Sequence, residues 1–254
     1  MQLYDIQNVV FAYAGHPHSL EDISFSVLNG ERLALLGANG SGKSTLLHLL
    51  DGLYFATTGE IRIWHELLTE EELMRTEFNH RFRSQVGFLF QNSDAQLFCA
   101  TVEEELAFGP LQLRLSSTEI RQRIEDSLTL LQINHLRDRA PQTLSVGQKK
   151  MVALASVLIL NPSVLLLDEP TAGLDPRSQG MLLEILEELS DRGMTIITAT
   201  HDMDLLPRIA DRALILSENH RLVANLPVSN CLANTELLVS VNLLMPNTEA
   251  IYKR

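Results

Sequence analysis

The chain has 254 residues, a length that suits one large domain or one domain with a subdomain. Its hydrophobic fraction of 45% is ordinary for a globular protein, so the composition allows a sizeable core. The formal net charge of −12 argues against a broad nucleic-acid-binding surface, because such surfaces are basic, and we expect no nucleic-acid partner. The two cysteines, Cys99 and Cys231, lie far apart, which argues against a disulfide scaffold and favours a reducing compartment.

Neither a signal peptide nor a membrane span is expected. The N-terminal residues Met1–Asp5 show no basic segment followed by an apolar one. The longest near-continuous apolar run, residues 151–160, is too short, since a spanning helix needs roughly 20 such residues. We therefore expect that this chain does not cross a bilayer by itself.

Short strand-like segments fill the first third of the chain. The residue pattern predicts strands at Asn8–Tyr13, Ile23–Leu28, Arg32–Leu36 and Gly59–Trp64. The pair Asn29-Gly30 is a strong two-residue turn signal. We therefore predict that the second and third of these strands form a β-hairpin.

Helical spacing replaces this pattern in the middle third. Ser116–Glu119 reads as a capping box, and apolar residues follow it at helical spacing as far as Leu131. A second helix is expected at about 145–160, where Asn161-Pro162 ends it. We interpret residues 92–160 as a mostly helical insertion.

The last third returns to alternating strands and helices. Val164–Leu167 and Thr195–Ala199 are short, fully apolar runs, which are typical of strands buried on both faces of a parallel sheet. Apolar residues within 181–189 line a helix between them. Residues 232–244 are expected to form a short helix that packs back on the core.

Residues Gly37 to Ser44 fit the phosphate-binding P-loop pattern Gly-x-x-x-x-Gly-Lys-Ser/Thr, with an apolar strand before them and an apolar helix after them. Glycines let the backbone bend around a triphosphate and point successive N–H groups at its oxygens. The helix N-terminus adds a favourable field for anions. We predict that Lys43 bridges the β- and γ-phosphates and that the Ser44 hydroxyl binds Mg²⁺.

An acidic pair follows a predicted buried strand, since Asp168 and Glu169 come directly after Val164–Leu167. An ionised carboxylate at the end of a buried strand is costly unless it is paired, so we predict that Asp168 holds Mg²⁺, directly or through water. Glu169 is then placed to polarise an attacking water as a general base. The alternative is a carboxylate that caps the next helix, and the P-loop upstream makes it the minor reading.

The P-loop and this acidic pair, together with further motifs that follow the family's order along the chain, resemble the ATP-binding-cassette (ABC) ATPases over about residues 3–224. Leu144–Gln148 looks like the family's signature motif, which usually reads Leu-Ser-Gly-Gly-Gln. Asp168-Glu169 matches the Walker B end, with its catalytic glutamate. The remaining matches are Gln91 in the Q-loop, Ala172–Asp175 as the D-loop, His201 as the switch histidine and Tyr13 as an aromatic residue that stacks on adenine.

This resemblance implies an α/β fold, a P-loop NTPase of ABC type with a mostly parallel core sheet, an antiparallel β subdomain and a helical subdomain insertion. We expect a single ABC ATPase domain over residues 1–254. Within it, 1–91 and 161–226 would form a RecA-like core with the antiparallel β subdomain. Residues 92–160 would form the helical signature subdomain, and 227–254 a C-terminal extension.

The resemblance also implies that two cassettes sandwich two ATP molecules, each held by the P-loop of one subunit and the signature helix of the other. Because Ser145–Gln148 open a helix, their free N–H groups and the Ser145 hydroxyl can bind a γ-phosphate. The implied catalytic residues are Glu169, His201 and Lys43, and the implied Mg²⁺ ligands are Ser44, Gln91 and Asp168. The implied nucleotide-binding residues are Tyr13, Gly37, Asn39, Gly40, Ser41, Gly42, Lys43, Ser44, Thr45, Gln91, Ser145, Gly147, Gln148 and Asp175.

Two site residues have other readings, and one position departs from the family pattern. Tyr13 could belong to the strand core, and His201 could merely cap a helix. Val146 stands where the signature motif has glycine. A β-branched residue cannot take a backbone geometry reserved for glycine and adds bulk near the phosphate, so full closure around ATP is in question there.

Segments 86–98 and 101–110 look like those of the energy-coupling-factor importers, especially the cobalt/nickel branch. This resemblance implies an ATP-hydrolysing subunit at the cytoplasmic face of the cell membrane, held there by integral membrane partners. The implied partners are a second, identical or related ATPase subunit, a transmembrane coupling subunit and a membrane substrate-binding subunit. Phe90, Leu97 and Phe98 either form part of a groove for the coupling subunit or belong to the subdomain core.

Other functions remain as alternatives. The main one is a soluble, non-transport ABC ATPase that acts in translation or DNA maintenance, but such proteins usually carry two cassettes or a long coiled-coil insertion. A nucleotide-binding regulator without hydrolysis is disfavoured by Glu169 and His201, and a GTPase by the lack of an Asn-Lys-x-Asp sequence. The sequence distinguishes neither cobalt from nickel or a vitamin, nor a homodimer from a heterodimer.

Overall fold

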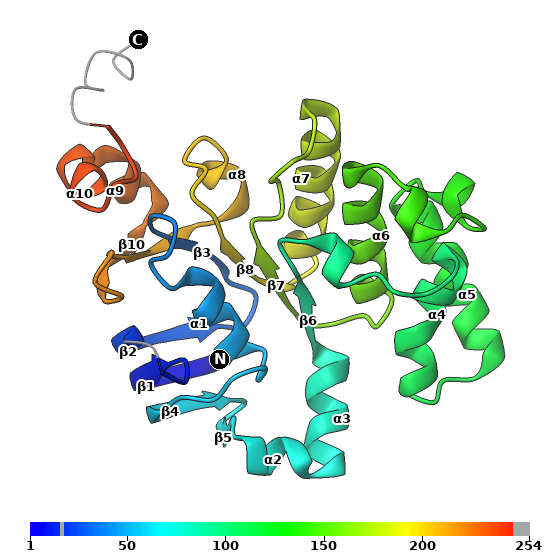
Figure 1. The fold of residues 1–254 in the computed structure, drawn as a ribbon, viewed down its shortest axis with the longest axis horizontal. Coiled ribbons are helices and arrows are strands. Elements are labelled where there is room, and N and C mark those ends of the chain that lie inside the picture. The colour runs from blue at the N-terminus through cyan, green and yellow to red at the C-terminus, as the bar shows by residue number, and fades with distance from the viewer. Residues whose placement is uncertain (16–17, 246–254) are drawn as a thin grey trace.

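The computed structural model describes residues 1–15 and 18–245, and its strands form two sheets of different kinds (Figure 1). The smaller sheet is antiparallel, and its order is β2 (His18–Leu28), β1 (Gln2–Ala12), β4 (Thr58–Ile63) and β5 (Glu66–Leu67). The larger sheet has the order β10 (Leu222–Pro227), β9 (Arg212–Leu216), β3 (Arg32–Leu36), β8 (Thr195–Ala199), β7 (Val164–Asp168) and β6 (Val86–Leu89). Its strands run parallel except β10, which confirms the predicted mostly parallel core sheet with an antiparallel partner.

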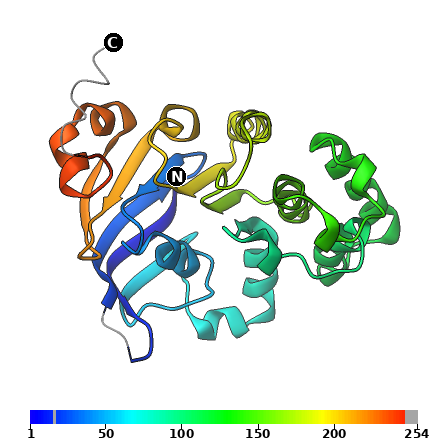
Figure 2. The same cartoon turned by 45° about the horizontal axis from the view of Figure 1, so that its top comes forward.

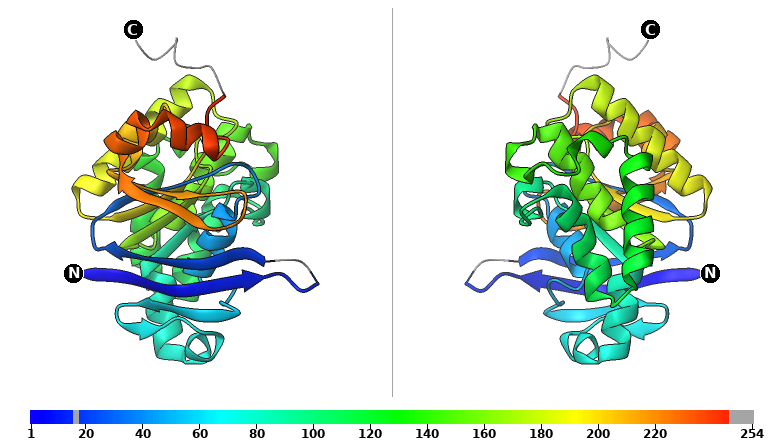
Figure 3. Two further views of the ribbon diagram at one scale, coloured as in Figure 1. Left: turned by 90° about the vertical axis from the view of Figure 1, so that its left-hand side faces the viewer. Right: turned by 90° about the vertical axis from the view of Figure 1, so that its right-hand side faces the viewer.

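Helix α1 (Lys43–Leu50) lies between the two sheets (Figures 1 and 3). Its leucines pack in one core cluster with residues of β1 and β2 on one side and of β3, β7 and β8 on the other. The Tyr4 hydroxyl on β1 donates to the backbone oxygen of Leu50, 2.9 Å away, and so ties the end of the helix to the smaller sheet. The helix that follows the P-loop is therefore held rigidly at both faces.

The predicted hairpin across Asn29-Gly30 is wrong. Strand β2 pairs with β1 in the smaller sheet, whereas β3 pairs with β8 and β9 in the larger one. Asn29-Gly30 is a tight turn that carries the chain between sheets, and the N–H of Gly30 donates to the hydroxyl of Thr195 at 2.8 Å. The turn signal records local geometry only, while the fully buried side chains of 33–36 suit the centre of a parallel sheet.

Between Ser93 and Leu158 every regular element is helical, and these elements lie together at one end of the molecule (Figure 1). They are η1 (Ser93–Ala95), α4 (Val102–Gln112), α5 (Ser117–Leu130), η2 (Asn134–Leu136), η3 (Pro141–Thr143) and α6 (Val146–Leu158). Both helices predicted in this segment are present. Of the predicted capping box, the structure shows the Ser116 hydroxyl accepting from the N–H of Glu119, at 3.2 Å.

Helices α6 and α7 (Pro176–Asp191) cover the same face of the core sheet and are seen end-on in Figure 2. Two short helices, α2 (Glu70–Met74) and α3 (Thr76–Gln85), lead from the smaller sheet into β6. A further short helix, α8 (Leu206–Ile209), precedes β9. No helix within residues 1–15 and 18–245 has the length and apolar character needed to cross a bilayer.

The predicted single helix near the C-terminus is instead two short helices, α9 (Val228–Ala233) and α10 (Thr235–Ser240). Asn234 separates them, because its side chain accepts from the N–H of Leu237 and starts a new helix. Both helices pack on the edge of the core sheet through Val228, Cys231 and Leu238. Residues 246–254 of the expected C-terminal extension lie outside the described residues.

A buried acid joins α1 to α3. Asp51 caps the C-terminal end of α1 and is 5% exposed, and Arg83 donates to its side chain at 3.2 Å and to its backbone oxygen at 2.9 Å. Burial raises the pKa of Asp51 to about 7, although Arg83 opposes the shift. Since an unfolded aspartate titrates near pH ~4, the folded state binds the proton more tightly between about pH 4 and 7.

Stability should therefore fall as the pH rises through this window. Between pH 5 and 8, we expect the parent to lose about 2 to 3 kcal/mol of unfolding free energy more than an Asp51→Asn variant does. Urea denaturation at the two pH values measures this difference. Asp138→Asn, at an exposed aspartate, is the control and should behave like the parent. An Asp51→Asn protein with the parent's pH dependence would contradict this assignment.

Candidate nucleotide-binding site

The loop between β3 and α1 has a backbone that only glycine fits at two positions. A Cβ atom at Gly37, with φ of +153°, would lie 2.4 Å from the Ser41 hydroxyl and 2.6 Å from a backbone oxygen. At Gly42, with φ of +106°, it would lie 2.6 Å from the backbone oxygen of Ser19. Gly42 is also the N-cap of α1 and offers no side-chain cap, so the first N–H groups of the helix stay available to an anion.

Lys43 is folded over this loop. Its ammonium group donates to the backbone oxygens of Gly37, at 2.8 Å, and Ala38, at 3.2 Å. Burial lowers the pKa of Lys43, while the charges of Glu169 and Asp168 raise it. The side chain therefore places a buried cation between the loop and the acidic pair.

A cavity of about 540 Å³ opens over the loop. It is lined by Tyr13, Ser19, Asn39, Gly40, Gly42, Lys43, Ser44, Thr45, Gln91, Glu169 and His201. Most of these residues are predicted nucleotide or catalytic residues from five separate parts of the sequence. Among the described residues that line it, none belongs to the signature segment Leu144–Gln148.

Asp168 ends β7 beside this cavity and is 4% exposed. Burial raises the pKa of Asp168, hydrogen bonding to Ser44 lowers it, and the neighbouring Glu169 raises it further. Its buried Oδ1 atom has no hydrogen-bond partner among the described residues. An unpaired carboxylate oxygen beside a serine hydroxyl is the donor set that Mg²⁺ prefers, so these residues fit the metal.

Glu169 is held by the residues that follow β8. Its Oε1 lies 2.7 Å from Nδ1 of His201, and its Oε2 accepts from the Thr200 hydroxyl at 3.3 Å. The Glu169 backbone has φ of +45°, a left-handed conformation that is uncommon for a residue with a side chain and that is frequent at functional sites. The Glu169 side chain is 8% exposed and that of His201 58%, so the pair spans from the interior to the surface.

Tyr13 and Gln91 also line the cavity. The Tyr13 hydroxyl lies 3.1 Å from that of Thr45, and its ring packs edge-on against Phe11 and Tyr54. Tyr13 thus lines the cavity and also packs on the core, so the two readings of this residue are compatible. Gln91 is exposed and reaches the same cavity.

The signature and D-loop residues lie at the starts of two other helices. The Ser145 hydroxyl accepts from the N–H of Gln148, and the Gln148 side chain accepts from the N–H of Ser145, which completes a capping box on α6. Asp175 caps α7 through the N–H groups of Arg177 and Ser178, and the Ser178 hydroxyl lowers its pKa. A Cβ atom at Gly147 would approach the Ser178 hydroxyl to 3.3 Å, so the two helix starts are adjacent.

The structure removes one concern about Val146. This residue is the first of α6 and is absent from the residues with positive φ, so its backbone does not require glycine. Its side chain is 61% exposed. One of its methyl groups would lie 3.4 Å from a Cβ atom at Gly173 in the D-loop. The expectation of a backbone reserved for glycine is therefore wrong, and only the exposed bulk of valine remains.

Three residues of this site were missed in the sequence. Ser19 lines the cavity from the start of β2, and the hydroxyl of Thr200, one position before His201, donates to Glu169. Lys150, on α6, is 1% exposed, and burial lowers its pKa while Asp168 and Glu169 raise it. A lysine inside an apolar helical run was the available signal for Lys150, because such a residue needs buried acceptors.

Comparisons with known proteins identify the family. The family model described as "ABC transporter" matches residues 20–172. The nickel import ATP-binding protein NikO of Rhodobacter capsulatus is 48% identical over 244 residues, which cover 95% of this chain and 95% of that protein. The energy-coupling factor transporter ATP-binding protein EcfA of Methanoculleus marisnigri is 38% identical over 247 residues, which cover 97% of this chain and 87% of that protein.

A solved structure supports the same conclusion. That of cbiO1 from Clostridium perfringens, described as part of the ABC transporter complex cbiONQ, matches with a TM-score of 0.80 and 35% identity. The match covers 96% of this chain and 96% of that one. The chain therefore belongs to the ABC transporter family as an ATP-binding subunit, an ATPase whose hydrolysis is coupled to transport.

Proposed function

We propose that this chain energises a membrane importer of the energy-coupling-factor type, for cobalt or nickel ions, through ATP-driven closure of two cassettes. One observation carries the proposal. The cavity contains a P-loop and an acidic pair in one chain, while the start of α6 is exposed and does not line it. A γ-phosphate bound there is enclosed only when another cassette supplies its own α6.

The P-loop residues and Tyr13 would bind ATP, with the adenine on the Tyr13 side. Backbone N–H groups between Gly37 and Thr45 would donate to phosphate oxygens, and Lys43 would exchange its two backbone acceptors for phosphate oxygens. Ser44, Gln91 and Asp168 would hold Mg²⁺. The ion would neutralise charge that develops on the phosphates.

Glu169 and His201 would perform the hydrolytic step. Glu169 is the general base in this assignment, since it is the carboxylate that lines the cavity and takes no part in metal binding. The contacts from Thr200 and His201 fix its two oxygens, so it is oriented before water arrives. His201 stays partly exposed and would contact the γ-phosphate. Positioning of this kind supplies most of the catalysis in phosphoryl transfer.

The second half-site would come from the start of α6 in a partner cassette. There, Ser145, Gly147 and Gln148 would contact the γ-phosphate, and Asp175 lies beside them at the start of α7. The Ser145 hydroxyl oxygen accepts from the N–H of Gln148, so its own O–H would remain available to donate to a phosphate oxygen. The partner is a second copy of this chain or a close relative.

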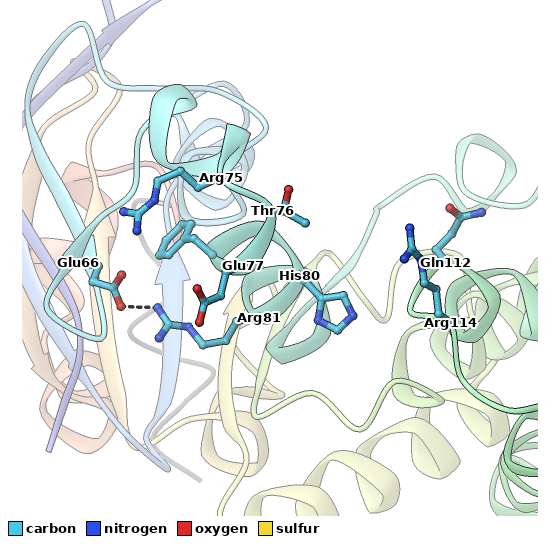
Figure 4. Close-up of a pocket in the computed structure, with 9 residues that line it drawn as sticks. Glu66, Arg75, Thr76, Glu77, His80, Arg81, Gln112 and Arg114 are labelled. Carbon is cyan, nitrogen blue, oxygen red and sulfur yellow. Dashed lines mark hydrogen bonds and ion pairs between the residues drawn. The ribbon is translucent and has the colours of Figure 1, made fainter.

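A groove of about 840 Å³ is our candidate contact for the transmembrane coupling subunit (Figure 4). The residues that line it are Glu66, Arg75, Thr76, Glu77, Phe78, His80, Arg81, Gln112 and Arg114. Figure 4 shows Gln112, the last residue of α4, and Arg114, which follows that helix, across the groove from the residues of α3. Arg81 bonds Glu66 and lies over the rings of Trp64 and Phe78, 4.8 and 5.5 Å from their centroids.

The apolar residues predicted for a coupling groove near Gln91 divide between core and surface, and none of them lines the groove in Figure 4. Leu97 is buried in the helical cluster, and Phe90 packs against the main core. Phe98 is 62% exposed and packs edge-on against Phe108. The exposed pair of Phe98 and Phe108 would be available for contact with a membrane subunit.

The cargo is proposed from the relatives. NikO is named for nickel import, and cbiO1 is described as part of the complex cbiONQ. The ion would pass through a membrane substrate-binding subunit rather than this chain. The chain would be located at the cytoplasmic face of the membrane through those integral partners.

The first test is Glu169→Gln, which removes the base and keeps the side-chain shape. We expect ATP turnover to fall by roughly a hundredfold or more, and MgATP to trap a stable dimer. Phosphate release and light scattering during gel filtration measure the two effects. Glu236→Gln, on exposed α10, is the matched control and should keep the parent's turnover. A Glu169→Gln protein that stays monomeric in MgATP while the parent dimerises would count against dimer closure.

The second test concerns the exposed valine of the signature. Val146→Gly should retain or raise the ATPase kcat, because it removes bulk beside the partner's phosphate without a change of backbone geometry. Val146→Ala also removes the bulk of valine but keeps a good helix former. Because glycine is about 1 kcal/mol less favourable than alanine in a helix, comparing the two variants separates the effect of bulk from that of backbone flexibility. A large loss of kcat in both variants, at an unchanged melting temperature, would show that the valine itself supports closure.

The third test addresses the membrane partners. A tagged chain should copurify with integral membrane subunits, and these subunits will identify the cargo. Arg114→Glu, in the groove, should lower their recovery by roughly fivefold, the size of a hot-spot effect. Arg121→Glu, at an exposed residue of α5 that does not line the groove, should leave recovery unchanged. Retention of ribosomes or DNA at physiological salt, without membrane proteins, would favour a soluble factor.

A further inference from the structure

A buried ammonium group joins the signature helix to the segment that carries Gln91. Lys150, on α6, is 1% exposed. Its Nζ atom donates to the backbone oxygen of Gln91 at 2.8 Å and lies 3.4 Å from that of Phe90. This contact is costly to break, because a buried ammonium group or a buried backbone oxygen left without a partner destabilises the folded protein.

A second contact joins the same two segments from the opposite direction. Gln96 accepts from the backbone N–H of Phe90 at 3.2 Å and donates to the backbone oxygen of Ala153, on α6, at 3.0 Å. Thus Lys150 reaches from α6 to the Gln91 segment, and Gln96 reaches from that segment back to α6. The contacts are three residues apart on the helix, so the segment cannot slide along it without breaking one of them.

These contacts link parts that would serve different ATP molecules. Gln91 lines the cavity of its own chain, whereas the start of α6 lies outside that cavity. Under the proposed function, the start of α6 meets the nucleotide held by the partner. The inference below rests on that function.

We propose that Lys150 is a positioning residue that couples the two ATP sites of the dimer. ATP and Mg²⁺ at one P-loop draw in Gln91, and the backbone contacts of Lys150 carry this displacement to α6. The signature residues at the start of α6 then reach the position in which they bind the partner's γ-phosphate. Occupancy of one site thereby promotes closure over the other, and Gln96 supports the same link.

The neighbouring lysine provides a matched comparison. Lys149 forms an ion pair at 2.5 Å with Asp94, which lies in the same segment as Gln91, and the two side chains are 17% and 65% exposed. Exposed pairs of this kind contribute little, about 0 to 1 kcal/mol. Lys149 and Lys150 therefore share a helix and a charge but differ in burial and in acceptor.

The experiment compares Lys150→Met with Lys149→Met, each in a Glu169→Gln background that allows dimers to accumulate. In Lys150→Met, the ATP concentration for half-maximal dimerisation should rise by about tenfold, within the usual range for coupling between sites. The affinity of the monomer for ATP, measured at protein concentrations that preclude dimers, should change less than about twofold, since the P-loop is untouched. Lys149→Met removes a contact to the exposed side chain of Asp94 in the same segment, so it should leave monomer affinity unchanged and shift dimerisation less than about twofold.

Gln96→Leu cuts the second contact from the other segment and tests the same link if Lys150→Met does not fold. It should shift dimerisation in the same direction and leave monomer affinity unchanged. A purely structural role for Lys150 would instead lower the melting temperature and the monomer affinity together. If the background dimerises and both variants dimerise equally well, the coupling role is overturned while the proposed function stands. If the background itself remains monomeric in MgATP, the proposed function and this inference fail together.

Discussion

The buried negative charge at the end of β7 is the constraint on which the rest of the site depends. Asp168 and Glu169 are 4% and 6% exposed, and two carboxylates cannot stay ionised in an apolar sheet without compensation. The compensation comes from Lys43, Lys150 and hydroxyl donors on three other elements. Because β3, β8 and β7 are parallel neighbours, their carboxyl ends meet at one edge, and the loops that follow them deliver these groups to one place.

The starts of α1, α6 and α7 have caps of two kinds. The start of α1 has a glycine cap with no side-chain bond, so its N–H groups are open to phosphate from the outset. The starts of α6 and α7 are capped by Ser145 and Asp175. At a capped helix start, the side chain of the cap already bonds some of the first N–H groups in the absence of ligand, whereas those of α1 have no such bond. Under the proposed function, the start of α1 would bind the phosphates of this chain's own ATP, and the start of α6 the γ-phosphate held by a partner cassette.

The sequence predicted correctly those parts of the protein whose structure is encoded by a short run of neighbouring residues. The P-loop, the buried strand before Asp168 and the helix after Ser145 are each encoded by contiguous residues, and the structure contains all three. The hairpin at Asn29-Gly30 failed because a turn signal does not state which sheet the next strand joins. The single C-terminal helix failed because Asn234, which starts a new helix, carries a weaker signal than the apolar residues around it.

Contacts between distant segments were beyond reach for a different reason. Lys150 meets the backbone oxygen of Gln91, and no side chain at position 91 reveals that its carbonyl will be an acceptor. Likewise, the bond of Thr200 to Glu169 depends on the pairing of β7 with β8, which a single sequence does not specify. The concern over Val146 was lifted only by the backbone, since the residue type alone does not give φ.

Contacts of α1 and α3 connect the nucleotide cavity with the groove, although the two share no lining residue. Helix α1 begins at the P-loop and ends at Asp51. The Arg83 side chain donates to the carboxylate of Asp51 and to its backbone oxygen. Arg83 lies on α3, the helix that supplies most of the groove's residues, and α3 leads directly into β6 and Gln91. These hydrogen bonds join the P-loop helix to the helix that lines the groove. The opposite wall, at the end of α4, packs on α6 through the helical cluster, so each wall is tied to a different half-site. Under the proposed function, closure of two cassettes around ATP would therefore act on both walls of the groove.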